Sequence, residues 1–193
     1  IMGHAHADHD ALGSCVGLAA LCRYCGVDAK IAMENDNENI SACLDCIEQD
    51  EVFSNVFVEC EEILDFVRPN TLLLISDVCN PRTFSVPELY ENVRRCVIID
   101  HHRLASELPY PPLISYIEPA ASSASELVAE ILEQVMPTGE ISKECADLML
   151  AGMLLDTDQF TRNTGVRTFS AALYLRGEGA DPADAKRLFR SSL

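Results

Sequence analysis

Long apolar runs are missing from this sequence of 193 residues. No stretch approaches the run of about 18 apolar residues that a membrane-spanning helix needs. Internal repeats, low-complexity tracts and clear linkers are missing as well, so nothing divides the chain into segments. We therefore expect no membrane contact by this stretch, and a single folded unit over residues 1–193.

Basic residues are scarce. Lysine and arginine together number 14 against 31 acidic residues, and the formal net charge is −17. Duplex nucleic acid binds proteins through a basic face, so this composition argues against such a partner. A phosphate-bearing substrate stays open, because bound metal ions can reverse the local charge. We take most of the acidic residues as a solvated surface.

Nine cysteines are present, an odd number, and most lie in apolar or helical contexts. This pattern is typical of reduced core cysteines, which favours a reducing cytosol. Two pairs, Cys22-x-x-Cys25 and Cys43-x-x-Cys46, have the spacing of a four-cysteine zinc site. Both pairs sit in helical patterns without glycine or proline knuckles, so structural zinc is the less favoured alternative.

The five histidines fall in two short clusters. The first cluster contains His4, His6 and His9, and the second contains His101 and His102. Aspartates accompany both clusters, and each cluster follows an apolar run that reads as a strand. Imidazole nitrogen together with carboxylate oxygen suits divalent first-row metals such as Mn, Fe or Zn. The sequence therefore predicts a metal-dependent enzyme.

Strands and helices are expected to alternate along the chain. We expect strands at 1–2, 29–33, 71–76, 96–99 and 113–117, and helices at 11–25, 40–49, 57–67, 123–135, 142–155, 165–176 and 182–189. The continuously apolar centre of 71–76 is typical of a strand covered on both faces. We predict an α/β fold with an open, mainly parallel five-stranded sheet sandwiched by helices. Ligand sites in such sheets lie beyond the carboxyl ends of the strands, where the polar clusters fall.

One set of acidic and imidazole side chains stands out. It comprises His4, Asp8, Asp10, Asp77, His101 and Asp156. Six groups on four segments are too many for one tetrahedral zinc, and they suit two ions about 3.5–4 Å apart that share a carboxylate. Asp77 leaves a central strand and is the natural bridge.

Three of these aspartates also have a simpler interpretation. Asp10 could cap the helix that it precedes, Asp77 could be a turn residue, and Asp156 could be a polar helix end. His6 and His9 are expected to face solvent or to contact the metal ligands without binding the metal themselves. Asp100 is expected to orient a histidine through its ring N–H.

Several motifs stand in a recognisable order. They are Gly-His-x-x-x-Asp-x-Asp-Ala-x-Gly-Ser at 3–14, Asp77, Asp100-His101-His102, Glu118-Pro119 with Ser122, Ser123 and Glu126, and Asp156-Thr157 with Phe160-Thr161 and Thr164-Gly165-x-Arg167-Thr168-Phe169. On these motifs the sequence resembles the DHH phosphoesterases over essentially the whole chain. The runs at 98–103 and 151–169 most resemble the catalytic domain of membrane-anchored cyclic-di-AMP phosphodiesterases.

The resemblance implies a role for each of these residues. Two Mn²⁺ ions per chain would be held, one by His4, Asp8 and Asp77, the other by Asp10, Asp77, His101 and Asp156. The catalytic residues would be His102, Asp77 and Arg103, with a hydroxide activated by both ions as the nucleophile. Arg103 and Arg167 are candidate phosphate clamps, and Ser122 and Ser123 could offer donors to an anion. For these last four residues a structural role is the alternative.

The resemblance also implies a larger context. The reaction would be hydrolysis of one phosphodiester bond of cyclic di-AMP to the linear dinucleotide. The chain begins Ile-Met-Gly-His, inside an expected strand, so we expect a catalytic fragment of a longer protein. That protein would be anchored to the bacterial membrane, with upstream sensory segments and a downstream substrate-binding domain. It would be a homodimer with this domain in the cytoplasm. One departure is Cys79, where that branch usually has a histidine.

Other functions compete with this interpretation. Within the same superfamily they are a short-oligoribonuclease or 3′-phosphoadenosine phosphate phosphatase, and a family-II-type inorganic pyrophosphatase. A metal-binding sensory or scaffold domain without catalysis is the non-enzymatic alternative. The ligand set counts against the scaffold, because two ions with open positions suit chemistry better.

Overall fold

The computed structural model describes residues 1–34, 37–48, 50, 52–103 and 108–190. Its helices are α1 (His9–Tyr24), α2 (Ser41–Glu48), α3 (Pro87–Asn92), α4 (Ala124–Val135), α5 (Lys143–Asp156), α6 (Val166–Gly177) and α7 (Pro182–Arg190). Its strands are β1 (Ile31–Met33), β2 (Phe57–Glu59), β3 (Leu73–Ser76), β4 (Cys96–Asp100) and β5 (Ile114–Ile117). Short 3₁₀ turns cover Ile63–Phe66 and Pro81–Thr83.

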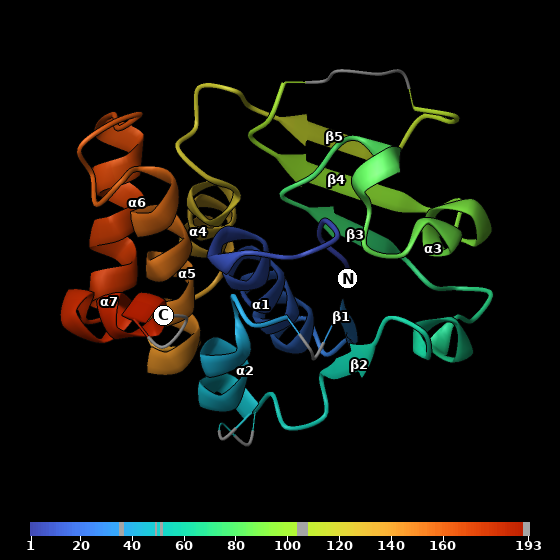
Figure 1. Ribbon diagram of the computed structural model, residues 1–193, viewed down its shortest axis with the longest axis horizontal. Coiled ribbons are helices and arrows are strands. Elements are labelled where there is room, and N and C mark those ends of the chain that lie inside the picture. The colour runs from blue at the N-terminus through green and yellow to red at the C-terminus, as the bar shows by residue number, and fades with distance from the viewer. Residues whose placement is uncertain (35–36, 49, 51, 104–107, 191–193) are drawn as a thin grey trace.

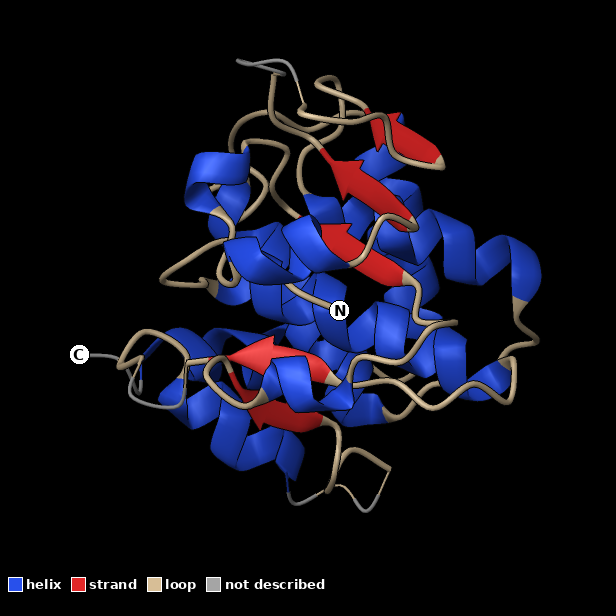
Figure 2. Cartoon of the chain, turned by 90° about the vertical axis from the view of Figure 1, so that its right-hand side faces the viewer, coloured by secondary structure: helices blue, strands red, loops and turns tan. Residues whose placement is uncertain are grey.

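The strands form two parallel ladders, β1-β2 and β3-β4-β5. The first two residues of the chain connect them. The Met2 amide donates to the Leu74 carbonyl at 2.9 Å, and the Ala32 amide donates to the Ile1 carbonyl, also at 2.9 Å. Figure 2 shows the N-terminus between the two groups of strands. The N-terminal segment therefore runs through the middle of the sheet, and the residues that follow it emerge at the carboxyl edge.

Alternate residues of the central strands enter two different cores. On β4, Cys96 and Ile98 pack with α3 residues on one face, whereas Ile99 packs with α1 and α4 residues on the other. Successive side chains of a strand point to opposite faces, so both faces must be covered. The larger core lies among α1, α4 and α5, which stand together beside the sheet in Figure 1.

Helices α1 and α5 pack closely because glycines line their contact. A Cβ added at Gly13 would lie 2.7 Å from the Leu148 carbonyl oxygen, and one at Gly17 would lie 2.8 Å from the Met149 sulfur. Residues 9–20 of α1 are all buried, as are residues 145–154 of α5. A helix that is buried all round is held by packing on every side. These two helices deliver acidic side chains to one end of the sheet.

The predicted fold class is confirmed: the structure is α/β, with parallel strands flanked by helices. The predicted helix at 57–67 is wrong. Phe57–Glu59 pairs with β1 instead, and only Ile63–Phe66 forms a 3₁₀ turn. Pairing with a neighbouring strand overrides local preference in this segment. In place of the strand predicted at 1–2, Met2 alone makes an isolated bridge, to Ile75 of β3, and α3 was not predicted. The end of the predicted helix at Gln49 lies outside the described residues.

Among the helices in the described residues, none combines the length and the apolar character needed to cross a membrane.

The close contact of α1 and α5 leads to a first prediction. Gly13→Ala should lower the free energy of unfolding by about 1–3 kcal/mol, because the added methyl meets backbone rather than a flexible side chain. Gly177→Ala is the matched control, since a Cβ there meets nothing within 4 Å. It should be neutral or stabilising by up to about 1 kcal/mol. Urea unfolding measures both, and equal stability of the two variants would contradict the packing argument.

Candidate metal centre

Four separate segments deliver polar side chains to the carboxyl edge of the sheet. His4 follows the bridge at Met2, Asp77 follows β3, His101 follows β4, and Asp156 is the last residue of α5. Asp8 caps the N-terminus of α1 by accepting from the amides of Asp10 and Ala11. The suggestion that Asp10 caps this helix is therefore wrong, since Asp8 does so.

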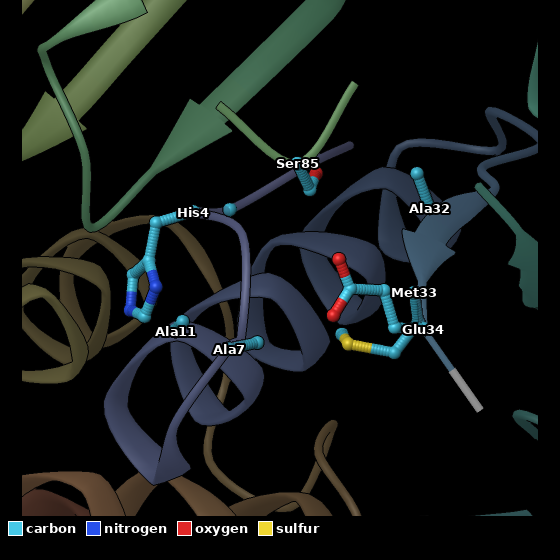
Figure 3. A pocket seen from close by; sticks show the side chains of 8 residues that line it. His4, Ala7, Ala11, Ala32, Met33, Glu34 and Ser85 are labelled. Carbon is cyan, nitrogen blue, oxygen red and sulfur yellow. The ribbon is translucent and has the colours of Figure 1, made fainter. Parts of the chain in front are cut away.

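One group of three ligand atoms comes from His4, Asp8 and Asp77, and we call it the first half-site. The His4 Nε2 atom lies 3.5 Å from Asp77 Oδ2 and 3.9 Å from Asp8 Oδ1. Glu34 is a further acidic residue near His4, but it does not belong to this group. Figure 3 shows the Glu34 carboxylate and the His4 ring on opposite sides of the segment that leads into α1. Glu34 instead lies 3.5 Å from the exposed His6 ring.

A second group comes from Asp10, His101 and Asp156, and we call it the second half-site. His101 Nε2 lies 3.1 Å from Asp156 Oδ2, 3.8 Å from Asp10 Oδ2 and 3.3 Å from Asp77 Oδ1. Asp77 thus directs one oxygen to His4 in the first half-site and the other to His101 in the second. This arrangement is the one that a shared carboxylate between two ions requires.

The crowding of carboxylates shifts proton affinities. Burial raises the pKa of Asp10 well above its usual range, and the neighbouring Asp77 and Asp156 charges raise it further. The Asp77 carboxylate, helped by Asp8, raises the pKa of His4 to about 11. Burial opposes protonation of His101, but the carboxylates of Asp156 and Asp77 outweigh it and raise the pKa to about 11.

The residues present fit divalent metal ions. Asp77 Oδ1 and His101 Nε2 are buried and have no hydrogen-bond partner, although they lie 3.3 Å apart. A buried polar atom without a partner costs free energy, whereas a cation between these groups would satisfy both and offset the repulsion among the carboxylates. The mixed nitrogen and oxygen donors match the preferences of first-row metals such as manganese.

Backbone amides hold Asp10 in place. The Asp10 carboxylate is fully buried and accepts from the amides of Ala124 at 2.7 Å and Ser125 at 2.9 Å, the first two residues of α4. Ser123 caps this helix, which begins where the sequence predicts a helix start. Sequence reasoning missed this contact, because an amide donor has no residue identity. The one sequence feature that could have indicated this contact was the helix start expected at residue 123, which follows the polar residues after the strand at 113–117.

A hydrogen bond to Asp100 orients the His102 ring. The His102 ring Nδ1 lies 2.8 Å from Asp100 Oδ1, and the same oxygen accepts from the His102 amide at 3.1 Å. Asp100 therefore has the predicted orienting position, and its charge raises the pKa of His102. Cys79 lies beside this pair. Burial and the Asp100 carboxylate raise the pKa of its thiol to about 12, so Cys79 is a neutral thiol in this site.

A cavity of about 500 Å³ opens over the first half-site. Metal-site candidates His4, Asp8, Asp77 and Asp156 line it, together with Cys79, Asn80, Thr83 and others. The exposed His102 and Arg103 stand at the same cavity. A phosphate bound in this cavity, next to the two half-sites, could therefore contact both His102 and Arg103.

The other substrate-contact candidates have partners within the protein. Arg167 holds Glu130 through two hydrogen bonds of 2.7 and 2.6 Å. Ser122 donates to Glu126, and the Ser123 hydroxyl accepts from the Glu126 amide at 3.0 Å. Ser122 would have to give up its bond to Glu126 to donate to a phosphate, whereas the Ser123 hydroxyl only accepts and keeps its own proton. The role of these residues in substrate binding stays a prediction.

The structure also places the remaining histidines, His6 and His9, and the two cysteine pairs. His6 is exposed, but His9 is buried, because its ring packs 4.7 Å from the Phe189 ring of α7. Of the two alternatives expected for His9, the solvent-facing one is therefore wrong, and the ring contacts that the structure shows are with Leu188 and Phe189 of α7. Cys22 and Cys25 lie at the C-terminal end of α1, and Cys43 and Cys46 lie on α2. Among the described residues, no candidate metal-binding group contains a cysteine.

Comparison with known proteins identifies the family. The profile of the DHH family, N-terminal domain, matches residues 1–153. The chain belongs to the DHH family. The DHH resemblance expected from the motifs is thereby confirmed.

Among relatives of this DHH chain is the cyclic-di-AMP phosphodiesterase GdpP of Geobacillus thermodenitrificans, 34% identical over 196 residues, which cover all of this chain and 30% of that protein. A probable manganese-dependent inorganic pyrophosphatase of Streptococcus thermophilus is 30% identical over 160 residues, covering 81% of this chain and 47% of that protein. An exopolyphosphatase-related protein from Bacteroides fragilis has the same fold, with a TM-score of 0.74 and 23% identity over 97% of this chain and 54% of that structure. The chain spans about a third of the length of the GdpP relative.

The electrostatics of the DHH site predict that metal binding releases protons. With pKa values of about 11, His4 and His101 are protonated at neutral pH in the metal-free chain. A metal requires their neutral rings, so Mn²⁺ affinity should rise with pH between pH 6 and 8. Calorimetric titrations in buffers of different ionisation enthalpy count the released protons. A binding enthalpy independent of the buffer would contradict this prediction.

Proposed function

We propose that this chain is the catalytic domain of a two-metal phosphodiesterase that opens cyclic di-AMP to the linear dinucleotide. Its GdpP relative is named for action on cyclic di-AMP and matches the whole of this chain. The observation that carries the proposal is the placement of Asp77, with one oxygen 3.5 Å from His4 and the other 3.3 Å from His101.

The two half-sites would hold one Mn²⁺ ion each. His4, Asp8 and Asp77 would hold the first ion, and Asp10, His101 and Asp156, with Asp77, would hold the second. Ions bound in this way would lower the pKa of bound water and neutralise charge on phosphoryl oxygens. The chain is strongly acidic, so only such a cluster of cations would attract a phosphodiester to this edge of the sheet.

Protein groups next to the half-sites would handle the substrate. His102 is half exposed at the cavity and held by Asp100, with a raised pKa that favours its cationic form. It would donate a hydrogen bond to a phosphate oxygen as negative charge develops there. Arg103 is exposed at the same cavity and would contact a second phosphate oxygen.

Inorganic pyrophosphate is the second candidate substrate. The Streptococcus relative is named a probable manganese-dependent inorganic pyrophosphatase and matches 81% of this chain. The same two half-sites would serve either reaction, because both are attacks at phosphorus beside two cations. The stronger match to the cyclic-di-AMP phosphodiesterase, over the full chain, favours the cyclic dinucleotide.

The shared position of Asp77 predicts that one substitution disturbs both ions. Asp77→Asn keeps the side-chain size and tolerates the left-handed backbone at this residue (φ 60°). It removes the charge on which both half-sites depend, so affinity for both Mn²⁺ ions should fall by about tenfold or more. Calorimetric titration measures both sites, with Glu34→Gln as the control acidic residue outside them. Retention of two ions at unchanged affinity would refute the bridging assignment.

The substrate assignment is tested by product analysis. The Mn²⁺-loaded chain, in excess over substrate, is incubated separately with cyclic di-AMP, its linear dinucleotide, 3′-phosphoadenosine phosphate and pyrophosphate. We expect cyclic di-AMP to be converted to the linear dinucleotide. If only the linear compounds or pyrophosphate disappear, the assignment is wrong. A chain that binds two ions but turns over none of the four would support the scaffold alternative.

A further inference from the structure

The Asp10 carboxylate lies in a cradle built by parts of the chain that are remote in sequence. Its Oδ2 accepts from the Ala124 amide at 2.7 Å and its Oδ1 from the Ser125 amide at 2.9 Å. Amides in the first turn of a helix have no partner within the helix, and their positive end favours an anion. Each oxygen of Asp10 thus has one fixed donor and keeps a lone pair directed elsewhere.

Gly152 of α5 closes the same cradle from the other side. A Cβ at this position would lie 2.7 Å from Asp10 Cα, 2.8 Å from Asp10 Oδ1 and 2.7 Å from the Ser125 hydroxyl. Real Cβ atoms essentially never make contacts shorter than 3.0 Å. The start of α1, the start of α4 and the middle of α5 therefore meet at Asp10 only because residue 152 has no side chain.

The first half-site does not share this cradle. Asp8 is held by amides of its own helix, those of Asp10 and Ala11 at 2.9 and 3.1 Å. His4 and Asp77 come from the strand side of the site. A displacement of the Asp10 side chain by α4 or α5 therefore acts first on the second half-site.

We propose that the first turn of α4 and Gly152 act together as positioning elements for Asp10, so that they set metal binding in the second half-site and affect the first half-site much less. This inference rests on the two-ion site proposed above. Neither Ala124 nor Gly152 offers a ligand atom from its side chain, so their role is exerted wholly through Asp10.

Ala124→Pro tests the α4 half of the cradle. Proline is tolerated at the first position of a helix, and the preceding residue, Ser123, already has the extended backbone that proline requires (φ −164°, ψ 162°). The ring removes the N–H that binds Asp10 Oδ2 and occupies its place. We expect one Mn²⁺ to bind as in the unchanged chain and the second to bind at least tenfold more weakly. Calorimetry and the electron paramagnetic resonance of coupled Mn²⁺ pairs report both.

Val166→Pro is the matched control for this variant. Val166 is the first residue of α6 and is 85% exposed, and it belongs to neither half-site. This control should bind two ions with the affinities of the unchanged chain.

Gly152→Ala tests the cradle from the α5 side. It should weaken the ion of the second half-site by at least tenfold and the other ion by less, because the methyl also meets Asp10 Cα, next to the amide that holds Asp8. Gly13→Ala is its control, since it crowds the same α1–α5 contact against the Leu148 carbonyl instead of Asp10. It should lose stability but keep two ions. Circular dichroism verifies that each variant folds. If one of the two cradle variants, Ala124→Pro or Gly152→Ala, does not fold, the Mn²⁺ titration of the other one tests the proposal.

The outcomes separate this inference from the proposed function. If the unchanged chain binds fewer than two Mn²⁺ ions, the two-metal proposal itself fails. If it binds two, and a folded Ala124→Pro or Gly152→Ala chain binds two with affinities within about twofold of its control, the positioning inference is wrong. Equal weakening of both ions would contradict the selective effect on the second half-site.

Discussion

The structure depends on one carboxylate placed between two imidazoles. Asp77 follows β3 with a left-handed backbone (φ 60°), which turns the chain sharply at the strand end. Left-handed backbone costs a residue with a side chain about 1–2 kcal/mol, although aspartate is among those that tolerate it. The buried side chain presents one oxygen to His4 and the other to His101. The other three candidate ligands lie beside these imidazoles, Asp8 at His4 and both Asp10 and Asp156 at His101.

Burial gives this arrangement its electrostatic character. Asp10 and Asp77 are almost completely removed from solvent and stand close to Asp156. Protons on the neighbouring His4 and His101 rings relieve part of this repulsion, as their raised pKa values indicate. Strand ends and helix ends hold the candidate ligands, so the fold keeps them together despite that repulsion. A divalent cation would replace these protons and offset the same repulsion.

Much of this could be predicted from the sequence. The apolar runs before Asp77 and Asp100 indicated buried strands, and parallel strands bring their carboxyl ends to one edge, so the meeting of Asp77 and His101 follows from pattern alone. Asp156 ends a helix, and its ligand role was implied only by the family resemblance. The segment at 57–67 could not be assigned, because its pairing with β1 is a tertiary contact. His9 was misjudged since nothing in the sequence shows that α7 folds back over it. The amides that hold Asp10, and the missing side chain of Gly152, belong to the backbone and become visible only when three helices are placed together.

Anomalous diffraction at the manganese edge from crystals of the Mn²⁺-loaded chain tests the central claim most directly. The account predicts two peaks about 3.5–4 Å apart, with one Asp77 oxygen bound to each ion. A single peak, or two peaks of which only one touches Asp77, would contradict it.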